Sequence, residues 1–527
     1  MKTIGETLVA RLRERGVDTV FGIPGVHTVE LYRGLAASGI RHVTPRHEQG
    51  AGFMADGYAR ASGKPGVAFV ITGPGLTNTL TAMAQARADS VPMLVVSGVN
   101  RLPTLGKGLG HLHELPDQRA LARQVALVSE RIENAHGLDV ALKLAFAPFA
   151  SGRPGPTHIE LPLDVAAWPY DCVETSEQPD KRSAPIAVQI AQAAEALDGA
   201  ERPIILAGGG CRYAADLLRT LAEKLDAPVV QTANARGVLH AHPLGVPACP
   251  DLKSVRSLIE NADAVLALGT ELGPTDYDQF DTGSLAVMSN LIRVDISADQ
   301  LARRPAKLKI HSDVASAMTQ LLSALSDRRN NGAGAERAAR TRKTAWQEIG
   351  PAYRHMSNML AAARKAVPNA LMIGDSTQPI YAGNLYYDHD RAGGWFNAAT
   401  GFGALGYAIP AAIGAACALP EAPVICIAGD GGAQFSLPEI MAAKDENLPI
   451  TFVIWNNDGY GEIETSMEAA GVTVVGCDPT PPQFADIAKA CGLPYAKCPN
   501  DPTAFGKALR AAEAIVGPRM IEISISE

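Results

Sequence analysis

The sequence has no hydrophobic run long enough to cross a membrane. Its longest apolar stretch, residues 408–428, is interrupted by three prolines and a glutamate, whereas a transmembrane helix needs about 20 mostly apolar residues in succession. Residues 1–6 also lack the apolar core of a signal peptide. We therefore expect a cytoplasmic protein with no membrane partner.

Charged blocks and cysteine pairs are also missing. Charged residues make up 19% of the chain, the net charge is −8 at pH 7, and no block of Lys or Arg occurs, which argues against a nucleic-acid partner. The eight cysteines form no Cys-x-x-Cys pair. We expect them to be reduced, buried thiols rather than disulfides or metal ligands.

Apolar residues, by contrast, are plentiful and occur in short runs. They make up 47% of the chain, and its length of 527 residues suggests three or four domains at about 150 residues each. Runs rich in Val and Ile alternate with segments of helical periodicity, which predicts parallel sheets with crossover helices. The expected strands are residues 19–21, 67–71, 93–96 and 158–162, then 203–207, 228–231, 264–268 and 292–295, and last 370–373, 424–428, 450–455 and 520–525.

Two polar segments divide this pattern. Residues 171–188 and 327–342 are rich in charged and turn-forming residues, and we predict that they are linkers or loops. The predicted fold class is α/β, with three doubly wound parallel-sheet domains at residues 1–170, 186–330 and 345–527.

Two predicted strands of the last domain run into polar residues. Residues 424–428 lead into Gly429-Asp430-Gly431-Gly432, and residues 450–455 lead into Asn456-Asn457. A helix between parallel strands makes a right-handed crossover, so both strands end at the same edge of the sheet, where ligands of open α/β sheets bind. We expect Asp430 and Asn457 to reach one point, with the backbone carbonyl of Gly459 as a third donor.

These donors suit a magnesium ion. Mg²⁺ prefers octahedral oxygen at about 2.1 Å and usually keeps phosphate and water in its shell. Glycines allow the backbone to approach a diphosphate closely, and the N-terminus of the next helix faces the anion. A Gly-Asp-Gly turn alone is common, but its combination with Asn456-Asn457, each after a buried strand, is specific.

The same residues resemble the thiamine-diphosphate signature of the family that contains benzoylformate decarboxylase, pyruvate decarboxylase and acetolactate synthase. The likeness extends to residues 21–25, 46–51, 55–60 and 72–78. It implies two thiamine-diphosphate-binding folds flanking a Rossmann-like middle domain, with thiamine diphosphate and Mg²⁺ as cofactors. It also implies a homodimer or homotetramer with active sites at the subunit interface.

In this family a Glu of one subunit holds the aminopyrimidine of the cofactor bound by the facing subunit, and Glu48 stands at that position. A carboxylic acid bonded to ring N1′ favours the imino tautomer, whose N4′ removes the thiazolium C2 proton, and apolar neighbours such as Phe53 and Met54 suit this role. Leu405 would wedge the cofactor into its bent shape, although core packing explains it equally. The resemblance assigns cofactor contacts to Pro24, Gly25, Glu48, Gly73, Asn78, Thr377, Gln378, Gly403, Leu405, Asp430, Gly431, Gly432, Asn457, Gly459, Tyr460 and Gly461.

Histidines are the candidate proton donors. The cofactor supplies the covalent chemistry, and the protein chooses the product by where it places acids. His113 aligns roughly with a catalytic Gln of acetolactate synthases, and His27 follows the Pro24-Gly25-Val26 turn. Because an imidazole titrates near pH 7, we expect His27 and His113 to be catalytic, His47 to be structural and His111 to be solvent-exposed.

The substrate class rests on departures from the better-known relatives. Val26 stands where pyruvate decarboxylases have Asp and benzoylformate decarboxylase has Ser, and residues 458–464 lack the substrate-binding pattern of acetolactate synthases. Residues 25–34, 112–119 and 459–463 are most similar to 5-guanidino-2-oxopentanoate decarboxylases. A guanidinium tail requires carboxylates for bidentate hydrogen bonds. Candidate substrate contacts are Val26, His27, Glu462 and Ile463, with Glu271, Asp276, Asp278 and Asp281 as further carboxylates that also fit ordinary solvated loop charges.

The middle domain carries a weaker signal, the turn Gly208-Gly209-Gly210 after a strand. The turn lacks a complete dinucleotide fingerprint, which argues against a nicotinamide oxidoreductase. Some relatives bind FAD or ADP here and others bind nothing, so FAD is an alternative ligand that we do not favour.

The predicted function is non-oxidative decarboxylation of a 2-oxo acid to an aldehyde and CO₂, dependent on thiamine diphosphate and Mg²⁺. The candidate substrate is 5-guanidino-2-oxopentanoate. One alternative is an acetolactate-synthase-like carboligase that joins the decarboxylated acid to a second carbonyl. Another is a non-catalytic regulatory protein that keeps the fold, against which Glu48, Asp430 and Asn457 argue because all three are present.

Overall fold

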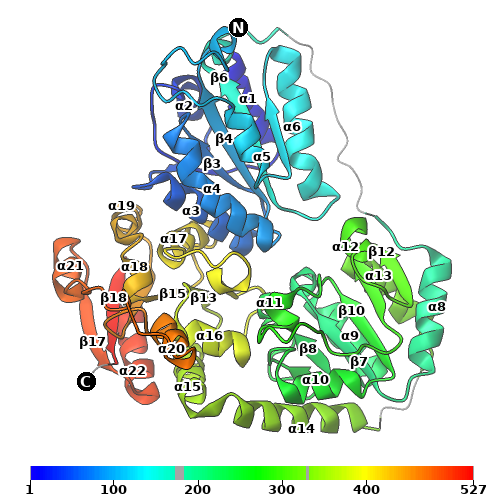
Figure 1. The fold of residues 1–527 in the computed structure, drawn as a ribbon. Coiled ribbons are helices and arrows are strands. Elements are labelled where there is room, and N and C mark those ends of the chain that lie inside the picture. Colours follow the sequence, from blue (N-terminus) through cyan, green and yellow to red (C-terminus); the bar gives the residue numbers. More distant parts are fainter. Residues whose placement is uncertain (1, 172–182, 328–330, 526–527) are drawn as a thin grey trace.

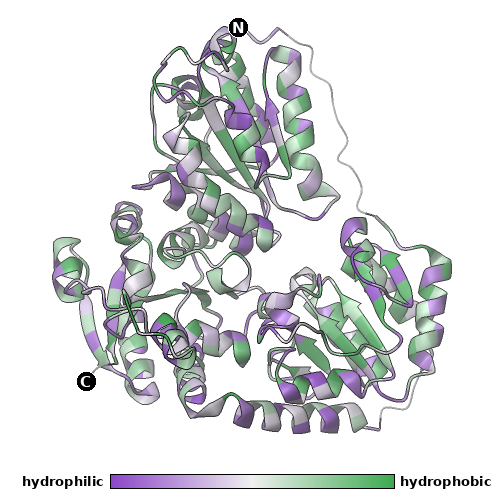
Figure 2. Ribbon diagram, in the orientation of Figure 1, coloured by the Kyte–Doolittle hydropathy of each residue, from purple (hydrophilic) through white to green (hydrophobic). Residues whose placement is uncertain are grey.

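The chain folds into three lobes at the corners of a triangle, each built on a six-stranded parallel sheet (Figure 1). A computed structural model describes residues 2–171, 183–327 and 331–525. Strands are apolar and helices are apolar on one side (Figure 2), as expected where helices cover both faces of a sheet. The predicted α/β class with three parallel sheets is confirmed.

The first sheet has the order β2-β1-β3-β4-β6-β5. In its third strand, Val67 and Phe69 pack with the helices of one face, whereas Ala68 and Val70 belong to the core on the other face, because successive side chains of a strand point to opposite sides. Its strands are β1 (Thr19–Gly22), β2 (Arg41–Val43), β3 (Gly66–Val70), β4 (Met93–Val99), β5 (Val128–Arg131) and β6 (Pro156–Pro162). Its helices are α1 (Ile4–Glu14), α2 (Val29–Ala36), α3 (Glu48–Ser62), α4 (Pro74–Ala88), α5 (Gln118–Arg123), α6 (Ala135–Ala150) and α7 (Leu163–Ala166), with the 3₁₀ turn η1 (Leu102–Thr104).

The middle sheet has the order β12-β11-β10-β7-β8-β9. Two apolar clusters lie on its two faces. Its strands are β7 (Pro203–Ala207), β8 (Val229–Gln231), β9 (Gly245–Val246), β10 (Ala264–Leu268), β11 (Ile292–Asp295) and β12 (Leu308–His311). Its helices are α8 (Ala187–Asp198), α9 (Ala215–Leu225), α10 (Lys253–Glu260), α11 (Pro274–Tyr277), α12 (Ala298–Ala302) and α13 (Val314–Ala324), with the turns η2 (Gly209–Cys211) and η3 (Ala233–Ala235).

The third sheet has the order β14-β13-β15-β16-β18-β17. Its strands are β13 (Leu371–Gly374), β14 (Trp395–Asn397), β15 (Val424–Gly429), β16 (Ile450–Asn456), β17 (Tyr495–Pro499) and β18 (Arg519–Ser524). Helix α14 (Ala333–Glu348) packs against the middle sheet. The helices of the third part are α15 (Gly350–Ala366), α16 (Gln378–Leu385), α17 (Ala408–Ala418), α18 (Asp430–Ala433), α19 (Ile440–Asp445), α20 (Gly461–Ala469), α21 (Phe484–Ala490) and α22 (Pro502–Glu513), with the turns η4 (Ala398–Thr400) and η5 (Leu437–Glu439). Strands β15 and β16 are hydrogen-bonded neighbours, so their polar ends meet at one edge.

The predicted loop at residues 327–342 is wrong for its larger part. Helix α14 begins at Ala333 and runs along one side of the molecule between the middle and C-terminal lobes (Figure 1). Its sequence is rich in Ala, Arg and Glu, which favour helices, and Ala338, Thr341 and Ala345 are buried along it. The other predicted linker, residues 171–188, lies mostly outside the described residues, and its last two residues belong to α8.

Two helices join the first and third sheets into one core. Apolar side chains of α3 and α17 belong to a single cluster that also includes strand residues of both sheets. The helices touch backbone to backbone: a Cβ on Gly57 would overlap the carbonyl of Ala411, and one on Gly414 would overlap the carbonyl of Met54. The middle of α3, whose first residue is Glu48, is therefore in direct backbone contact with α17 of the C-terminal lobe.

The helices offer no membrane-spanning candidate within residues 2–171, 183–327 and 331–525, because none combines the necessary length and hydropathy. The seven cysteines in these ranges are all unpaired, as predicted.

Candidate functional site

Asp430 lies at the carboxyl end of β15, with its side chain fully buried. Its Oδ1 accepts a hydrogen bond from the backbone N–H of Asn457 at 3.3 Å, whereas its Oδ2 has no partner. Burial raises the pKa of this carboxyl, and the Asn457 N–H opposes that shift. A buried carboxylate oxygen without a partner is costly, and a bound cation would relieve that cost.

The side-chain amide of Asn457 faces two oxygens. One of its terminal atoms lies 2.8 Å from Asp430 Oδ1 and 3.0 Å from the carbonyl oxygen of Gly459. An amide nitrogen there donates to both oxygens, whereas an amide oxygen there would complete a triangle of oxygens. Ligands at about 2.1 Å in an octahedral shell lie about 3 Å apart, and the two separations made by this amide atom have that size. Elsewhere in the described ranges, no group of three His, Cys, Asp or Glu side chains is arranged to hold a metal.

Glycines let the surrounding segments close on this edge. A Cβ on Gly431 would lie 2.5 Å from the ring of Tyr460, and one on Gly429 would lie 2.9 Å from Thr377 Oγ1. A Cβ on Gly461 would lie 2.5 Å from Asn457 Nδ2 and 3.6 Å from Gln378 Nε2. The structure thus gathers the predicted cofactor contacts Thr377, Gln378, Asp430, Gly431, Asn457, Gly459, Tyr460 and Gly461 from three separate segments.

Asp375 is a residue of this edge to which sequence reasoning assigned no role. It is fully buried after β13, and its carboxylate accepts hydrogen bonds from the backbone N–H groups of Ser376, Gly406 and Ala408. Burial raises the pKa of its carboxyl to about 6. Asp375 therefore ties the loop that carries the predicted contacts Gly403 and Leu405 to the third sheet. The position of an acidic residue directly after a buried strand was the signal available in the sequence.

That loop is exposed around its two predicted contacts. Gly403 has a φ of +74°, a left-handed conformation suited to glycine, and Leu405 is half-buried. Phe402 and Phe435 beside the loop are each more than half exposed, and a Cβ on Gly406 would lie 2.6 Å from Phe435 Cβ.

Glu48 is the first residue of α3 in the N-terminal lobe. Its Oε2 accepts a hydrogen bond from Asn78 Nδ2 at 2.9 Å, which brings two predicted cofactor contacts together. The side chain of His47 caps the same helix by accepting from Gln49 N–H, in agreement with its predicted structural role. His111 is exposed, as predicted.

A second carboxylate, Glu439, lies beside the start of α3. Its oxygens accept the backbone N–H groups of Arg46 and His47 at 2.9–3.1 Å, and a Cβ on Gly50 would overlap it. Burial raises the pKa of Glu439 to about 7, with a further contribution from the nearby charge of Glu48. Sequence reasoning missed this contact because it joins segments almost four hundred residues apart.

His27 and His113 form a pair in the same lobe. Their ring centroids are 5.6 Å apart, and burial lowers the pKa of His27. His113 has a φ of +60°, a conformation that costs a non-glycine residue about 1 kcal/mol or more. Its carbonyl oxygen would lie 2.5 Å from a Cβ on Gly73, so the predicted contact Gly73 is adjacent to it.

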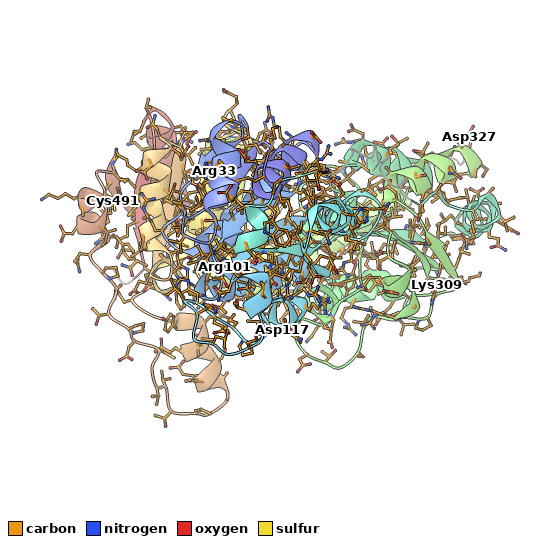
Figure 3. All side chains as sticks on the ribbon, turned by 90° about the horizontal axis from the view of Figure 1, so that it is seen from above. Arg33, Arg101, Asp117, Lys309, Asp327 and Cys491 are labelled. Atoms are coloured by element: carbon orange, nitrogen blue, oxygen red, sulfur yellow. The ribbon has the colours of Figure 1, made fainter. Side chains whose placement is uncertain are left out.

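The remaining predicted contacts lie at or near the surface of the N-terminal and C-terminal lobes. Val26, after Pro24 and Gly25, is 64% exposed, and Ile463 on α20 is 52% exposed. Seen from above, α20 and the loop after it project from the body (Figure 3), and α20 has no buried residue. The Tyr353 hydroxyl faces the carboxylate of Glu462.

The acidic loop of the middle lobe has its own partners. Glu271 pairs with Arg153 at 3.1 Å, Asp276 accepts Ala233 N–H, and Asp278 accepts from Thr282 and Gly283. None of these contacts involves the segments around Asp430 or Glu48.

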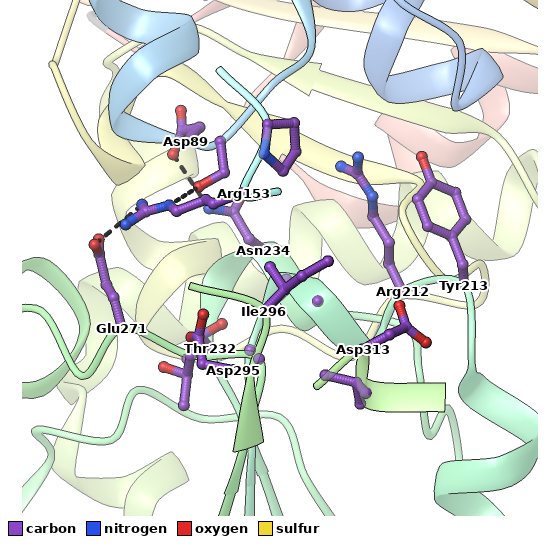
Figure 4. A pocket seen from close by; sticks show the side chains of 18 of the residues that line it. Asp89, Arg153, Arg212, Tyr213, Thr232, Asn234, Glu271, Asp295, Ile296 and Asp313 are labelled. Carbon is purple, nitrogen blue, oxygen red and sulfur yellow. Dashed lines mark hydrogen bonds and ion pairs between the residues drawn. The ribbon is translucent and has the colours of Figure 1, made fainter. Parts of the chain in front are cut away.

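A cavity of about 220 Å³ lies between the N-terminal and middle lobes (Figure 4). Its lining includes the turn Gly208–Gly210 but no predicted catalytic or thiamine-binding residue. A Cβ on Gly210 would lie 2.9 Å from Gly269 Cα, so close packing of two turns accounts for glycine there. Five carboxylates but only two arginines line the cavity: Asp89, Glu271, Asp276, Asp295 and Asp313 with Arg153 and Arg212. The excess of carboxylates over arginines gives the lining a negative charge, which would repel the phosphates of a dinucleotide.

Comparison with known proteins agrees with this geometry. Residues 2–121 match the N-terminal TPP binding domain of thiamine pyrophosphate enzymes, residues 190–321 match the central domain, and residues 375–523 match the C-terminal TPP binding domain. The chain is 41% identical to the probable 2-ketoarginine decarboxylase AruI of Pseudomonas aeruginosa, with 99% of this chain and 94% of the relative aligned. It is 31% identical to the acetolactate synthase isozyme 1 large subunit of Escherichia coli, with 87% and 82% aligned. The chain therefore belongs to the thiamine pyrophosphate enzyme family.

Proposed function

We propose that this protein is a Mg²⁺-dependent thiamine diphosphate enzyme that converts a 2-oxo acid into an aldehyde and CO₂ without net oxidation. The observation that carries the proposal is the convergence of Asp430, Asn457 and the Gly459 carbonyl at the ends of β15 and β16. When bound, thiamine diphosphate supplies a carbon nucleophile and accepts the electrons released with CO₂.

The C-terminal lobe would hold the charged end of the cofactor. Asp430, Asn457 and Gly459 would bind Mg²⁺, and the orphan Asp430 Oδ2 supports a cation at this point. Gly431, Gly432, Thr377 and Gln378 would contact the diphosphate through backbone and side-chain donors. The loop with Gly403 and Leu405, held by Asp375, would contact the rings.

Residues of the N-terminal lobe would activate the cofactor and supply the proton that the product requires. Glu48, held by Asn78, would exchange a proton with the aminopyrimidine ring. His27 and His113 would supply the proton that an aldehyde product requires, because an imidazole can transfer protons near neutral pH. We keep 1–170, 186–330 and 345–527 as the proposed domain boundaries, since each range contains one sheet.

Two copies of the chain would complete each site. Apolar side chains at the rims of both halves are more than half exposed, namely Val26, Leu112, Phe402, Phe435 and Ile463. Exposed apolar side chains of this size are candidates for an interaction surface. We therefore propose a homodimer or a homotetramer in which Glu48 of one subunit faces Asp430 of its partner.

The substrate we propose carries a guanidinium tail, as does the 2-oxo acid derived from arginine. The 41% identity with a probable 2-ketoarginine decarboxylase supports this class. Glu462 is the candidate partner of the guanidinium, and Tyr353 holds its carboxylate from the side of α15. A guanidinium binds a carboxylate through two parallel charge-assisted hydrogen bonds.

The decisive assay offers a panel of 2-oxo acids to the enzyme with thiamine diphosphate and Mg²⁺, and measures CO₂, aldehyde and acetolactate. We expect CO₂ and aldehyde from the guanidino acid, and both products should disappear when Mg²⁺ is chelated.

Glu48→Gln should keep the cofactor bound but lower kcat by about 100-fold or more, because an amide cannot exchange the proton. Hydrogen–deuterium exchange at C2 of the bound cofactor reports this step directly, and a wild-type exchange rate in the variant would refute the role of Glu48.

Acetolactate as the main product would instead favour a carboligase, the alternative supported by the 31% identical acetolactate synthase. Absence of both C2 exchange and turnover in the wild type would favour the third alternative, a regulatory protein that keeps the fold.

Glu462→Gln tests the substrate class. Losing a charge-assisted pair of about 1.5–3 kcal/mol should raise KM for the guanidino acid by about 10-fold or more, while KM for an uncharged 2-oxo acid stays the same. Glu464→Gln is the matched control, since Glu464 lies on the same turn of α20 and is exposed. Equal effects of the two variants would remove Glu462 from the site.

A further inference from the structure

His27 and His113, the pair proposed above for proton transfer, differ in how deeply their side chains are buried. His27 lies beyond β1 and is 7% exposed, whereas His113 lies in the loop before α5 and is half-buried. The deeper ring, His27, has a neutral polar partner that sequence reasoning did not consider.

That partner is Asn100, the residue directly after β4. Its side chain is buried, and its Oδ1 lies 3.2 Å from His27 Nε2. A carboxamide oxygen only accepts hydrogen bonds, so this contact favours the tautomer with hydrogen on Nε2. In a neutral imidazole the other nitrogen is then an acceptor.

The other nitrogen, His27 Nδ1, is buried and has no hydrogen-bond partner, and His113 Nδ1 shares both properties. Buried polar atoms in proteins are nearly always paired. Two such atoms on adjacent rings, 5.6 Å apart between centroids, indicate a place where a ligand supplies the missing partner.

The backbone is shaped to hold this arrangement. A Cβ on Gly98 in β4 would lie 2.5 Å from the carbonyl oxygen of His27, and one on Gly73 would lie 2.5 Å from that of His113. Glycine at both positions lets the two histidine segments press against the ends of β3 and β4. His113 also has a positive φ, a conformation that a non-glycine residue keeps only where the surrounding structure supports it.

We propose that Asn100 is a positioning residue for the proposed decarboxylation: it holds His27 with hydrogen on Nε2, so that Nδ1 is the atom that takes up and delivers the proton. Loss of CO₂ leaves a carbon that must gain one proton to become an aldehyde. Solvent protonates Nδ1, the imidazolium transfers that proton to the carbon, and the neutral Nε2–H form returns. The sum is one proton consumed for each CO₂ released.

The groups around His27 set its titration. Burial lowers its pKa, the Asn100 hydrogen bond opposes this, and the charge of His113 lowers it further. A carboxylate at position 100 would favour the imidazolium, so Asn100→Asp should move the His27 limb of the kcat profile upward by about one to two pH units.

The test compares kcat and KM against pH in the wild-type holoenzyme and in Asn100→Asp and Asn100→Leu. Leucine removes the acceptor but keeps the volume, so kcat should fall by about 10-fold with KM changed less than about twofold. In a His27→Gln background, Asn100→Asp should leave the pH profile unchanged. A profile that Asn100→Asp does not move in active enzyme would overturn the proposal.

A measurement independent of turnover separates this inference from the proposed function. NMR of the wild-type holoenzyme with ¹⁵N-labelled histidine, assigned with His27→Gln, reports which nitrogen of His27 carries hydrogen. We expect the Nε2–H tautomer; the Nδ1–H tautomer would refute the role of Asn100 whether or not the enzyme decarboxylates the acids tested.

Discussion

At the scale of single residues, strand ends were predictable and contacts between distant segments were not. Asp430 and Asn457 follow buried strands that the sequence marks as apolar runs, so their meeting at one edge follows from the crossover rule. Asp375, Asn100 and Glu439 form hydrogen bonds with partners that are far away in the sequence. Local patterns contain no information about such partners.

Glu439 leads to a prediction about stability and pH. Its pKa is raised from 4.5 to about 7 in the folded protein, so the folded chain holds this proton more tightly than the unfolded chain does. The resulting stabilisation is complete below about pH 4.5 and is lost as the pH rises through 7. Its full size is about 3 kcal/mol, since a tenfold difference in proton affinity between the folded and unfolded chains corresponds to about 1.4 kcal/mol.

Glu439→Gln should abolish that loss, because the amide oxygen can still accept from Arg46 and His47 but does not ionise. Urea unfolding at several pH values from 5 to 8 measures it: the stability of the variant relative to wild type should increase with pH. Asp445→Asn is the control, since the Arg46–Asp445 pair is largely exposed and surface pairs contribute about 1 kcal/mol or less. A constant difference between Glu439→Gln and wild type would contradict the assignment.

At the scale of elements, the sequence indicated the inner strands of all three sheets and missed every edge strand. The missed strands are β2 and β5, β9 and β12, and β14 and β17, which close the three sheets on both sides. Inner strands are covered on both faces and form continuous apolar runs. Edge strands lack that signal: in β17 only Cys498 is buried, and β9 has only two residues.

Most of helix α14 was predicted to be a linker or loop because its sequence is polar. Polar residues and the turn-forming run at residues 330–334 suggested a linker or loop, but a helix on the outside of a domain needs only a narrow buried stripe, supplied here by Ala338, Thr341 and Ala345. A polar composition therefore distinguishes a solvent-facing helix from a loop poorly.

The contact between α3 and α17 gives a prediction at this scale. Gly414→Ala would push a methyl group into the Met54 carbonyl, and the helices would have to separate. We expect a loss of about 3 kcal/mol or more in the free energy of unfolding, together with weaker cofactor retention, because α3 begins at Glu48. Chemical unfolding measures the first and gel filtration with cofactor analysis the second.

Gly506→Ala in α22 is the matched control. The nearest atom to its added Cβ is 3.5 Å away, and alanine is favoured over glycine inside a helix by up to about 1 kcal/mol. This variant should be as stable as wild type or slightly more so. Equal destabilisation by both substitutions would show that the close approach of α3 and α17 is not the cause.

At the scale of the whole molecule, one buried ionic group connects the three lobes. Arg60 of α3 binds Asp56 at 2.6 Å and Asp89 at 2.7 Å. Asp89 also accepts from Asn234 of the middle lobe and Thr400 of the C-terminal lobe. Because removing one member of a buried ion pair leaves an uncompensated charge, this group resists rearrangement of the lobes.

Hydrophobic periodicity and the residues directly after each strand were enough to predict the α/β class, the inner strands and the meeting of Asp430 and Asn457 at one sheet edge. The contacts across long separations, by contrast, become visible only in the folded chain: Glu439 with the start of α3, Asp375 with the loop of Gly403, and Asn100 with His27. The physical reason is that these contacts are made between segments placed by the packing of whole sheets and helices, and that placement is a property of the assembled core rather than of any local stretch of chain.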